Sequence, residues 1–399
     1  MQHFFSRRAV LKIVPLLGAT MIFGGQCAHA TTAPDRNASL KQEIELSINR
    51  ALAFLKEKQD KGNGSWSLAT EPGITGLVLS GFAAKPGRKP GEALPPEADH
   101  GYHFLLENVK PDGGIYSTER ANYNTAIALV ALSQNPRPEY VRTIINARKF
   151  IYTQQNDFDT KGVADNAFDG GIGYGKPGPT TPPHADMSNT HFALEALDYS
   201  KQIFVKKATK ADKKTDLDWP AVVKFVDRCQ NRPASNDQPW ASDDAKNFGG
   251  FVYEPGISKA GEDKLPGGRV ALRSYGSITC TGILNYFYAG VKPSDPRVQD
   301  ALKWLGENYT LAQNPNMDQE GRYYYYLRLA KSLTVGKVNV LTAKDGRAID
   351  WRSELSRQLL NDQRANGSWQ NDTSRWMESD PVLVTAYTVI ALEHIYRGL

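Results

Sequence analysis

Asp186 is the acidic side chain of this sequence that is best placed for chemistry. It opens the run Asp186-Met187-Ser188-Asn189-Thr190, which His191 follows. Asp380, in front of an apolar run near the C-terminus, is the second candidate catalytic residue. A carboxyl group can act as a general acid or base. At the start of a helix, however, the helix dipole favours its ionised form, which suits an anchoring anion or a helix cap better than a strong acid.

Aromatic side chains form the second group of candidates. The run 323–326 consists of four tyrosines at the start of a predicted helix, and a tryptophan follows Gly367-Ser368. Such rings pack between helices, stack on sugars or lipids, and stabilise organic cations. The candidate ligand contacts are therefore His191, Tyr323, Tyr324, Tyr326 and Trp369.

We predict neither a metal site nor a cofactor. His184, Asp186 and His191 could be imagined as ligands, but loop residues and a histidine on a helix face explain them more simply. Three glycines at 171, 173 and 175 follow no strand, so they indicate a turn rather than a dinucleotide fingerprint. Of the three cysteines, Cys229 and Cys280 lie in predicted helices, where two buried thiols are favoured over a disulfide.

The charge balance gives little support to nucleic-acid binding. Three basic residues lie within the first thirty positions, which contain no acid, and the rest of the 399-residue chain holds 45 basic and 43 acidic side chains. A protein that grips phosphates normally carries a basic stripe. The mean hydropathy of −0.48 also argues against a protein with many membrane spans.

Residues 1–30 have the pattern of a secretory signal peptide. Arg7 and Arg8 precede a short apolar run, and Ala28-His29-Ala30 forms a small-residue cleavage site. The paired arginines indicate the twin-arginine type. The apolar run is shorter than the roughly 20 residues needed to cross a bilayer. We expect cleavage after Ala30, no lasting membrane anchor, and a periplasmic or extracellular protein.

One structural unit recurs six times across residues 31–399. Each copy has an amphipathic helix ending in an apolar pair, a turn with glycine and an aromatic residue, and a more apolar second helix. The second copy shows it at 104–106, 112–116 and 125–132. In three of the turns, Gly113, Gly170 and Gly249 are expected to hold backbone conformations that a Cβ atom would strain.

Six helical hairpins predict an all-α fold, and closure into an (α/α)6 toroid is favoured over an open solenoid. The second helices are rich in small residues, as a tight inner ring requires, and the last unit is as apolar as the others. A lysine-rich stretch at about 200–217 is expected to be an insertion between the third and fourth units.

The repeat resembles those of squalene and terpene cyclases. Gln59…Gly64-Ser65-Trp66 and Gln363…Gly367-Ser368-Trp369 are similar to their Gln-Trp repeats, and the Gly-Gly-aromatic turns are similar to those of protein prenyltransferase β subunits. The resemblance covers nearly all of residues 31–399. It implies an α/α toroid with a central cavity that binds isoprenoids.

The residues that this resemblance would make catalytic are incomplete. The cyclases use Asp-x-Asp-Asp, with the central Asp as proton donor, whereas Ser188 and Asn189 follow Asp186 here. The prenyltransferase zinc site would need a Cys at 188 and a His near 276 or 277, where Gly276 and Ser277 stand. We expect Ser188 and Asn189 to cap the helix that follows.

Three hypotheses about function remain open. The favoured one is an exported toroid that binds an apolar, isoprenoid-like ligand or a partner protein in its central cavity. The second is a divergent cyclase or prenyltransferase that uses another acid, such as Asp186 or Asp380. The third is a toroid that acts on cell-surface polysaccharide through aromatic platforms.

Overall fold

The computed structural model describes residues 37–89, 91–157, 160–175 and 184–399. The predicted signal peptide, residues 1–30, lies outside them. Four short strands form two antiparallel pairs. Glu262–Lys264 (β1) pairs with Val270–Leu272 (β2), and Leu341–Thr342 (β3) pairs with Ala348–Ile349 (β4). The remaining regular structure of these residues is helical.

Twelve α-helices of the described residues form six hairpins, each with an outer and an inner member. The outer helices are α1 (Ala38–Glu57), α3 (Pro96–Glu107), α5 (Val141–Tyr152), α7 (Trp219–Arg228), α9 (Pro296–Glu307) and α11 (Trp351–Asn361). The inner helices are α2 (Pro72–Ala84), α4 (Ala121–Gln134), α6 (Met187–Lys207), α8 (Gly276–Tyr288), α10 (Arg322–Val335) and α12 (Pro381–Gly398).

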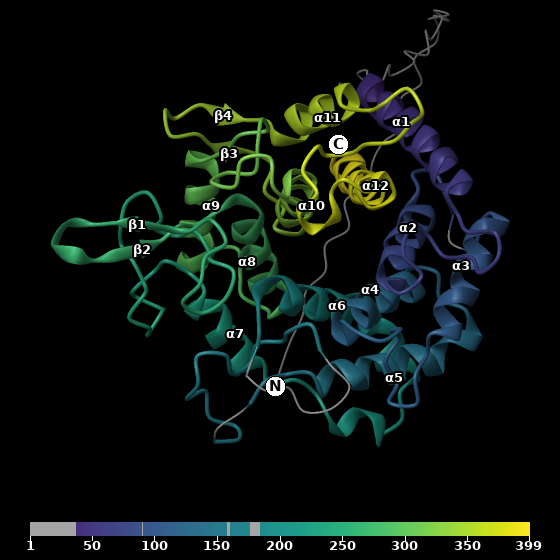
Figure 1. The fold of residues 1–399 in the computed structure, drawn as a ribbon, viewed down its shortest axis with the longest axis horizontal. Helices are drawn as coiled ribbons and strands as arrows, with labels where there is room; N and C mark the ends of the chain where they lie inside the picture. Colours follow the sequence, from purple (N-terminus) through teal and green to yellow (C-terminus); the bar gives the residue numbers. More distant parts are fainter. Residues whose placement is uncertain (1–36, 90, 158–159, 176–183) are drawn as a thin grey trace, which may run out of the picture. The chain divides into compact units, whose positions relative to one another are not determined.

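The inner helices close into a ring. Each packs against the next from α2 to α12, and α12 packs against α2 (Figure 1). The outer helix α1 contacts α11 and α12, so the first and last hairpins are neighbours. Residues 37–399 therefore form the predicted (α/α)6 toroid. Small residues of the inner helices permit this approach, because a Cβ atom at Gly76 of α2 would lie 3.2 Å from the Ile127 carbonyl oxygen of α4.

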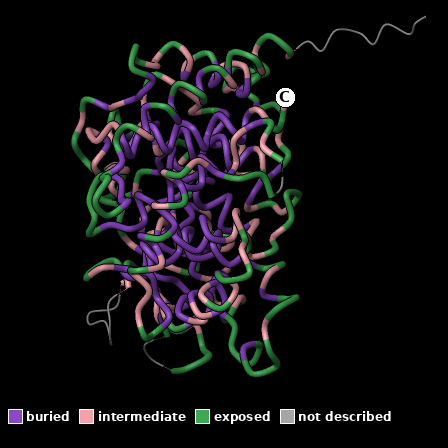
Figure 2. The backbone as a smooth tube through the Cα atoms, turned by 90° about the vertical axis from the view of Figure 1, so that its right-hand side faces the viewer, coloured by how far each residue is buried: buried purple, intermediate pink, exposed green. Residues whose placement is uncertain are grey.

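The core lies between the two helix layers. Buried residues gather in the interior of residues 37–399 and exposed residues on the outside (Figure 2). Nearly every residue of α2 is buried, whereas α1 buries one face that includes Ile44, Ile48 and Leu55. This difference follows from the hydrophobic patterns of the two helix types. Cys229 and Cys280 are buried and free. In the described part of the chain, no helix is both long and apolar enough to cross a membrane.

Glutamine side chains bond four of the six hairpins to their neighbours. The amide of Gln230 donates one hydrogen bond to the Gly249 carbonyl of its own turn, at 2.8 Å, and one to the Arg297 carbonyl of α9, at 2.9 Å. Gln59 and Gln155 repeat this double contact. Gln363 closes the ring by donating to the Gly367 carbonyl and to the Ser47 carbonyl of α1, each at 3.0 Å.

A threonine of the inner helix holds the aromatic end of the turn. The Trp66 backbone N–H donates to Thr75 Oγ1 at 3.0 Å, and the same bond joins Ile115 to Thr125 and Ile172 to Thr190. The fourth and sixth hairpins repeat it through Thr279 and Thr385. The turn is thus bonded to both of its own helices and to the next hairpin.

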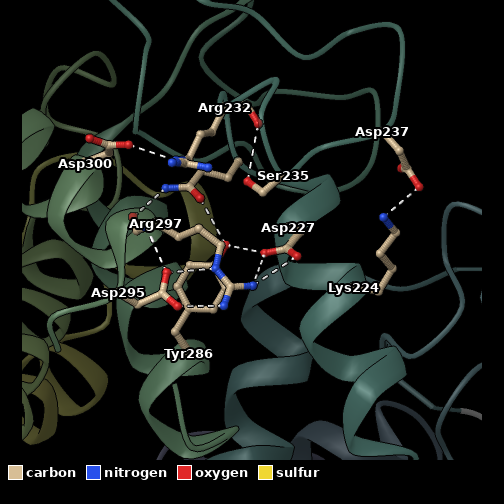
Figure 3. A network of polar contacts seen from close by, with 10 residues as sticks. Lys224, Asp227, Arg232, Ser235, Asp237, Tyr286, Asp295, Arg297 and Asp300 are labelled. Atoms are coloured by element: carbon tan, nitrogen blue, oxygen red, sulfur yellow. Dashed lines mark hydrogen bonds and ion pairs between the residues drawn. The ribbon is translucent and has the colours of Figure 1, made fainter. Parts of the chain in front are cut away.

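The junction of the fourth and fifth hairpins adds a buried polar network (Figure 3). Tyr286 of α8 donates its hydroxyl to Asp227 Oδ1 of α7 at 2.7 Å, and Arg297 of α9 donates to the same oxygen at 3.0 Å. Asp295 holds the other side of the Arg297 guanidinium at 2.9 Å. Three consecutive helices are therefore tied through one carboxylate.

The stretch predicted as an insertion is partly helical. Residues 200–207 continue α6, a 3-10 turn follows at Asp212–Lys214, and α7 begins at Trp219. Its lysines therefore extend from the C-terminal turns of an inner helix into the connection to the next outer helix.

The predicted turn glycines do adopt left-handed backbone conformations. The φ angles of Gly113, Gly170 and Gly249 are 93°, 86° and 87°. A Cβ atom at Gly249 would lie 2.3 Å from the Asp300 carbonyl oxygen of α9. A side chain here would therefore meet both a strained backbone and the neighbouring hairpin.

We expect Gly249→Ala to lower the free energy of unfolding by about 3 kcal/mol, through backbone strain together with a clash against main chain. Gly261→Ala is the matched control, since Gly261 has a φ of 81° but open space around it. Gly261→Ala should lower the free energy of unfolding by only about 1 kcal/mol. Urea unfolding followed by circular dichroism measures both, and equal losses would show that the contact with α9 is not a joint of the ring.

Candidate functional site

One cavity lies at the N-terminal ends of the inner helices. Its volume is about 200 Å³, and its wall includes residues from the first turns of all six inner helices or from the residues capping them. Loops that precede α6, α8 and α12 complete the wall. The cavity thus exists because six hairpins place their inner helices in the same direction around one axis.

The wall is mainly aromatic. Eight rings line the cavity: Tyr123, Tyr174, Phe192, Tyr253, Tyr275, Tyr324, Trp376 and Tyr387. Several hydroxyls have partners within the wall, since Tyr324 donates to Ser188 Oγ at 3.3 Å, and Tyr123 hydrogen-bonds Tyr387. Burial raises the pKa of Tyr275 and Tyr387 well above 10, which keeps both phenols neutral. The surface offered to a ligand is therefore largely uncharged ring.

An ion pair crosses the wall between the first two inner helices. Arg120, the residue before α4, donates to Glu71 Oε1 at 2.5 Å, and Asn124 donates to Glu71 Oε2 at 3.2 Å. Asn124 also accepts the Gly73 N–H of α2 at 2.8 Å. Both charges are thus matched, and the pair fixes the start of two helices.

Glu378 is the other carboxyl group of the wall. It is fully buried and accepts hydrogen bonds from the Tyr324 N–H at 2.7 Å and from Asn371 Nδ2 at 2.6 Å. Its second oxygen also lies 3.3 Å from the Tyr323 N–H. Burial raises the pKa of Glu378, although these donors oppose the rise. Its neutral form is therefore more accessible than that of an exposed glutamate.

Asp186 caps α6 and is not among the cavity-lining residues. It is fully buried and accepts the Asn189 N–H at 2.9 Å and the Asn189 side-chain amide at 2.7 Å. His184 Nε2 lies 3.2 Å from Asp186 Oδ2, the oxygen that also accepts the Asn189 amide, and His184 Nδ1 lies 3.3 Å from Glu254. Hydrogen bonds to these two carboxylates raise the pKa of His184 to about 9. Capping turns the Asp186 carboxylate back onto its own helix, the role that its position at a helix start favours.

Ser188 and Asp380 also differ from expectation. Ser188 does not cap α6 but lines the cavity, at the position of the proton donor in the resembling cyclases. Asp380 caps α12 by accepting the Val382 N–H at 2.8 Å, and Ser67 donates to its second oxygen. Neither predicted catalytic aspartate lines the cavity.

The predicted aromatic contacts divide by helix face. Tyr324 lines the cavity, whereas Tyr323 and Tyr326 pack around Arg322 on other sides of α10. Successive helical residues point about 100° apart, so neighbours in a tyrosine run cannot share one wall. Trp369 is buried in its turn and donates its indole N–H to the Leu359 carbonyl at 2.8 Å.

His191 belongs to a buried ionic cluster beneath the cavity. Its Nε2 contacts Arg328 and lies 3.2 Å from Glu195, which also pairs with Lys331. Burial and the adjacent Arg328 lower the pKa of His191 to about 3, so its ring is neutral. The Arg328 guanidinium lies 4.7 Å from the Phe192 ring centre and 4.6 Å from that of Tyr324. The ionic cluster thus fills the space inside the ring of inner helices, behind the cavity-lining side chains of Phe192 and Tyr324.

The described residues contain no group of three His, Cys, Asp or Glu side chains arranged to hold a metal. Sequence reasoning missed the wall residues Glu71, Tyr123, Glu378 and Tyr387. For Glu71, Tyr123 and Tyr387 the available signal was position, because each lies at or just before the first two turns of an inner helix. Tyr387 also stands four residues after Leu383, the spacing of one helix face.

Comparison with proteins of known structure identifies the fold of this chain. No protein-family model and no curated protein sequence matches the chain. An unliganded variant of the type II terpene cyclase MstE from Scytonema matches 90% of this chain and 99% of its own, with a TM-score of 0.51 and 13% identity. Another MstE variant, in complex with its substrate geranylgeranyl dihydroxybenzoate, matches with the same coverage and identity at a TM-score of 0.49. The described residues therefore have a terpene cyclase-like fold.

Proposed function

We propose that this protein binds an apolar small molecule of the isoprenoid class in the cavity at the N-terminal ends of its inner helices. The observation that carries the proposal is the wall of eight aromatic rings, in which the charged Glu71 and Arg120 neutralise each other. A cavity of this composition favours a ligand with much apolar surface and few polar groups. The isoprenoid class is supported by the resemblance of the Gln-Trp repeats to those of terpene cyclases.

Two features favour binding over cyclisation. Ser188 lines the cavity where the resemblance would place the proton donor, and a serine hydroxyl is far too weak an acid to protonate an alkene. The positive charge of Arg328 lies against the rings of Phe192 and Tyr324. Aromatic faces stabilise cations. Because the rings of Phe192 and Tyr324 already interact with the Arg328 guanidinium, they would stabilise a carbocation formed from a ligand less.

Filling the cavity should weaken ligand binding at least tenfold. Ser188→Trp places an indole in the wall without removing a core group, because among the described residues the Ser188 hydroxyl has a hydrogen bond with Tyr324 alone. Using all-trans-retinol, an isoprenoid alcohol whose fluorescence reports an apolar site, we expect at least a tenfold weaker Kd, about 1.4 kcal/mol. Ser39→Trp, an exposed substitution in the first turn of α1, is the matched control.

We expect wild type and Ser39→Trp to bind retinol with the same Kd. We expect Ser188→Trp to bind it at least tenfold more weakly. Equal binding by all three proteins would place the ligand elsewhere. No binding by the wild-type protein would contradict the proposed ligand class.

Glu378 favours one second candidate, a divergent cyclase. A neutral Glu378 could transfer its proton to an alkene carbon, forming a C–H bond and leaving a carboxylate that later recovers a proton from the cation. Our account expects no cyclic product from squalene or geranylgeraniol incubated with the purified protein. Turnover that is lost in Glu378→Gln and retained in Glu71→Gln, measured by mass spectrometry, would favour the cyclase instead.

We also propose that the protein is exported, on the strength of its twin-arginine-like N-terminus. Changing Arg7 and Arg8 together to Lys should keep the precursor inside the cytoplasm, because paired arginines are what this export route reads. Cell fractionation of a C-terminally tagged protein measures the outcome. A substitution of Lys12 by Arg is the control, and undiminished export of the double variant would contradict the assignment.

A further inference from the structure

The segment Arg375–Glu378, between the sixth turn and α12, lies at the mouth of the cavity. Trp376, Met377 and Glu378 all line the cavity, yet the Trp376 side chain is 44% exposed. Trp376 therefore has solvent on one side and the cavity on the other. Glu378 is fully buried, so the segment runs from the surface into the wall.

The backbone of this segment is strained. Trp376 and Met377 have φ angles of 54° and 64°, in the left-handed region that residues with a Cβ atom disfavour. They are the only two consecutive non-glycine residues with positive φ in the part of the chain that the structure describes. Strain of this kind persists only where surrounding contacts hold it, and it gathers at ligand clamps and switches.

Both ends of the segment are held, whereas the Trp376 indole between them is not held by a hydrogen bond. Arg375 pairs with Glu320. Glu378 is bonded to α10 through the Tyr324 N–H, and its carbonyl accepts the Asn371 N–H at 2.9 Å. The indole N–H of Trp376 has no hydrogen-bond partner among the described residues, whereas five other indoles donate to a backbone carbonyl. The Arg375 guanidinium lies 4.4 Å from the Trp376 ring centre, and the ring lies beside Gly321.

A ligand cannot enter or leave through the opposite end of the ring of inner helices. His191, Glu195, Arg328 and Lys331 form a fully buried ionic cluster behind Phe192 and Tyr324. Moving an apolar ligand past these charges would break buried ion pairs, which is costly. A ligand must therefore enter and leave at the N-terminal ends of the inner helices, where the exposed Trp376 lies.

We propose that Trp376 is the moving part of a gate that Arg375 and Glu378 hold at its two ends, and that the Trp376 side chain moves to admit the ligand. This inference rests on the proposed function. In the empty protein the left-handed backbone favours opening, since Trp376 and Met377 gain relaxed φ angles when they swing outward. Contact between a bound apolar ligand and the indole offsets that strain and holds the gate closed.

The test measures association and dissociation rates of all-trans-retinol by stopped-flow fluorescence. In Trp376→Ala both rates should rise about tenfold, because the moving part is gone. A residue that only contacts the ligand would change dissociation and leave association unaltered. Trp219→Ala, on the outer helix α7, controls for the loss of a partly exposed indole and should match wild type.

A second pair of variants tests the strain. Met377→Gly gives the left-handed backbone a residue that adopts it freely, so the closed gate is favoured and association should slow two- to fivefold. Lys337→Gly makes the same change at a φ of 54° in the loop after α10 and should leave both rates unaltered.

Three results would overturn parts of this account and can be told apart. An unchanged association rate in Trp376→Ala would overturn the gate, even with retinol bound normally. Equal rates in Met377→Gly and Lys337→Gly would overturn the role of strain. Failure of wild type to bind retinol at all would overturn the proposed function and the gate together.

Discussion

One interaction recurs at four of the six junctions of the toroid, a glutamine amide that donates both of its hydrogens to backbone carbonyls. Gln59, Gln155, Gln230 and Gln363 each join their own turn to the next hairpin, and Gln363 reaches the first helix to close the circle. One buried or half-buried side chain satisfies both carbonyls, so each of these contacts fixes the angle between neighbouring hairpins. The turn glycines permit this contact, because a Cβ atom would strike the next helix.

The fixed angle between neighbouring hairpins creates the cavity and determines which acidic side chains can line it. With six inner helices running the same way, six N-termini with unpaired N–H groups meet at one end of the ring. Carboxylates and amides gather there as caps: Asp186 and Asp380 cap their own helices, while Asn124, Asn314 and Glu378 cap a neighbouring one. Acids near the cavity are thus mostly structural, and among the described acidic residues Glu71 and Glu378 alone also line the cavity.

The fold was predictable and the site only in part, for a physical reason. Repeats specify the fold through local patterns, namely apolar stripes, turn glycines and the Gln-Trp pairs, which are readable in sequence. Which side chains line the cavity depends on how each helix is rotated about its own axis, so Tyr324 lines the cavity while Tyr323 and Tyr326 do not. Glu378 could not be singled out, because its burial follows from contacts with α10 that lie more than fifty residues away in sequence. Whether Asp186 acts as an acid or as a cap was likewise decided by its contact with Asn189.

The central claim is that the aromatic cavity holds an apolar isoprenoid-class molecule, and its most direct test is to identify what the protein carries. The protein would be purified without detergent from its source cells, beside Ser188→Trp expressed in the same cells, and both would be extracted and examined by mass spectrometry. We expect an apolar small molecule at close to one per wild-type chain and its loss from the variant. A wild-type protein that carries no such molecule, or equal amounts in both proteins, would contradict the account.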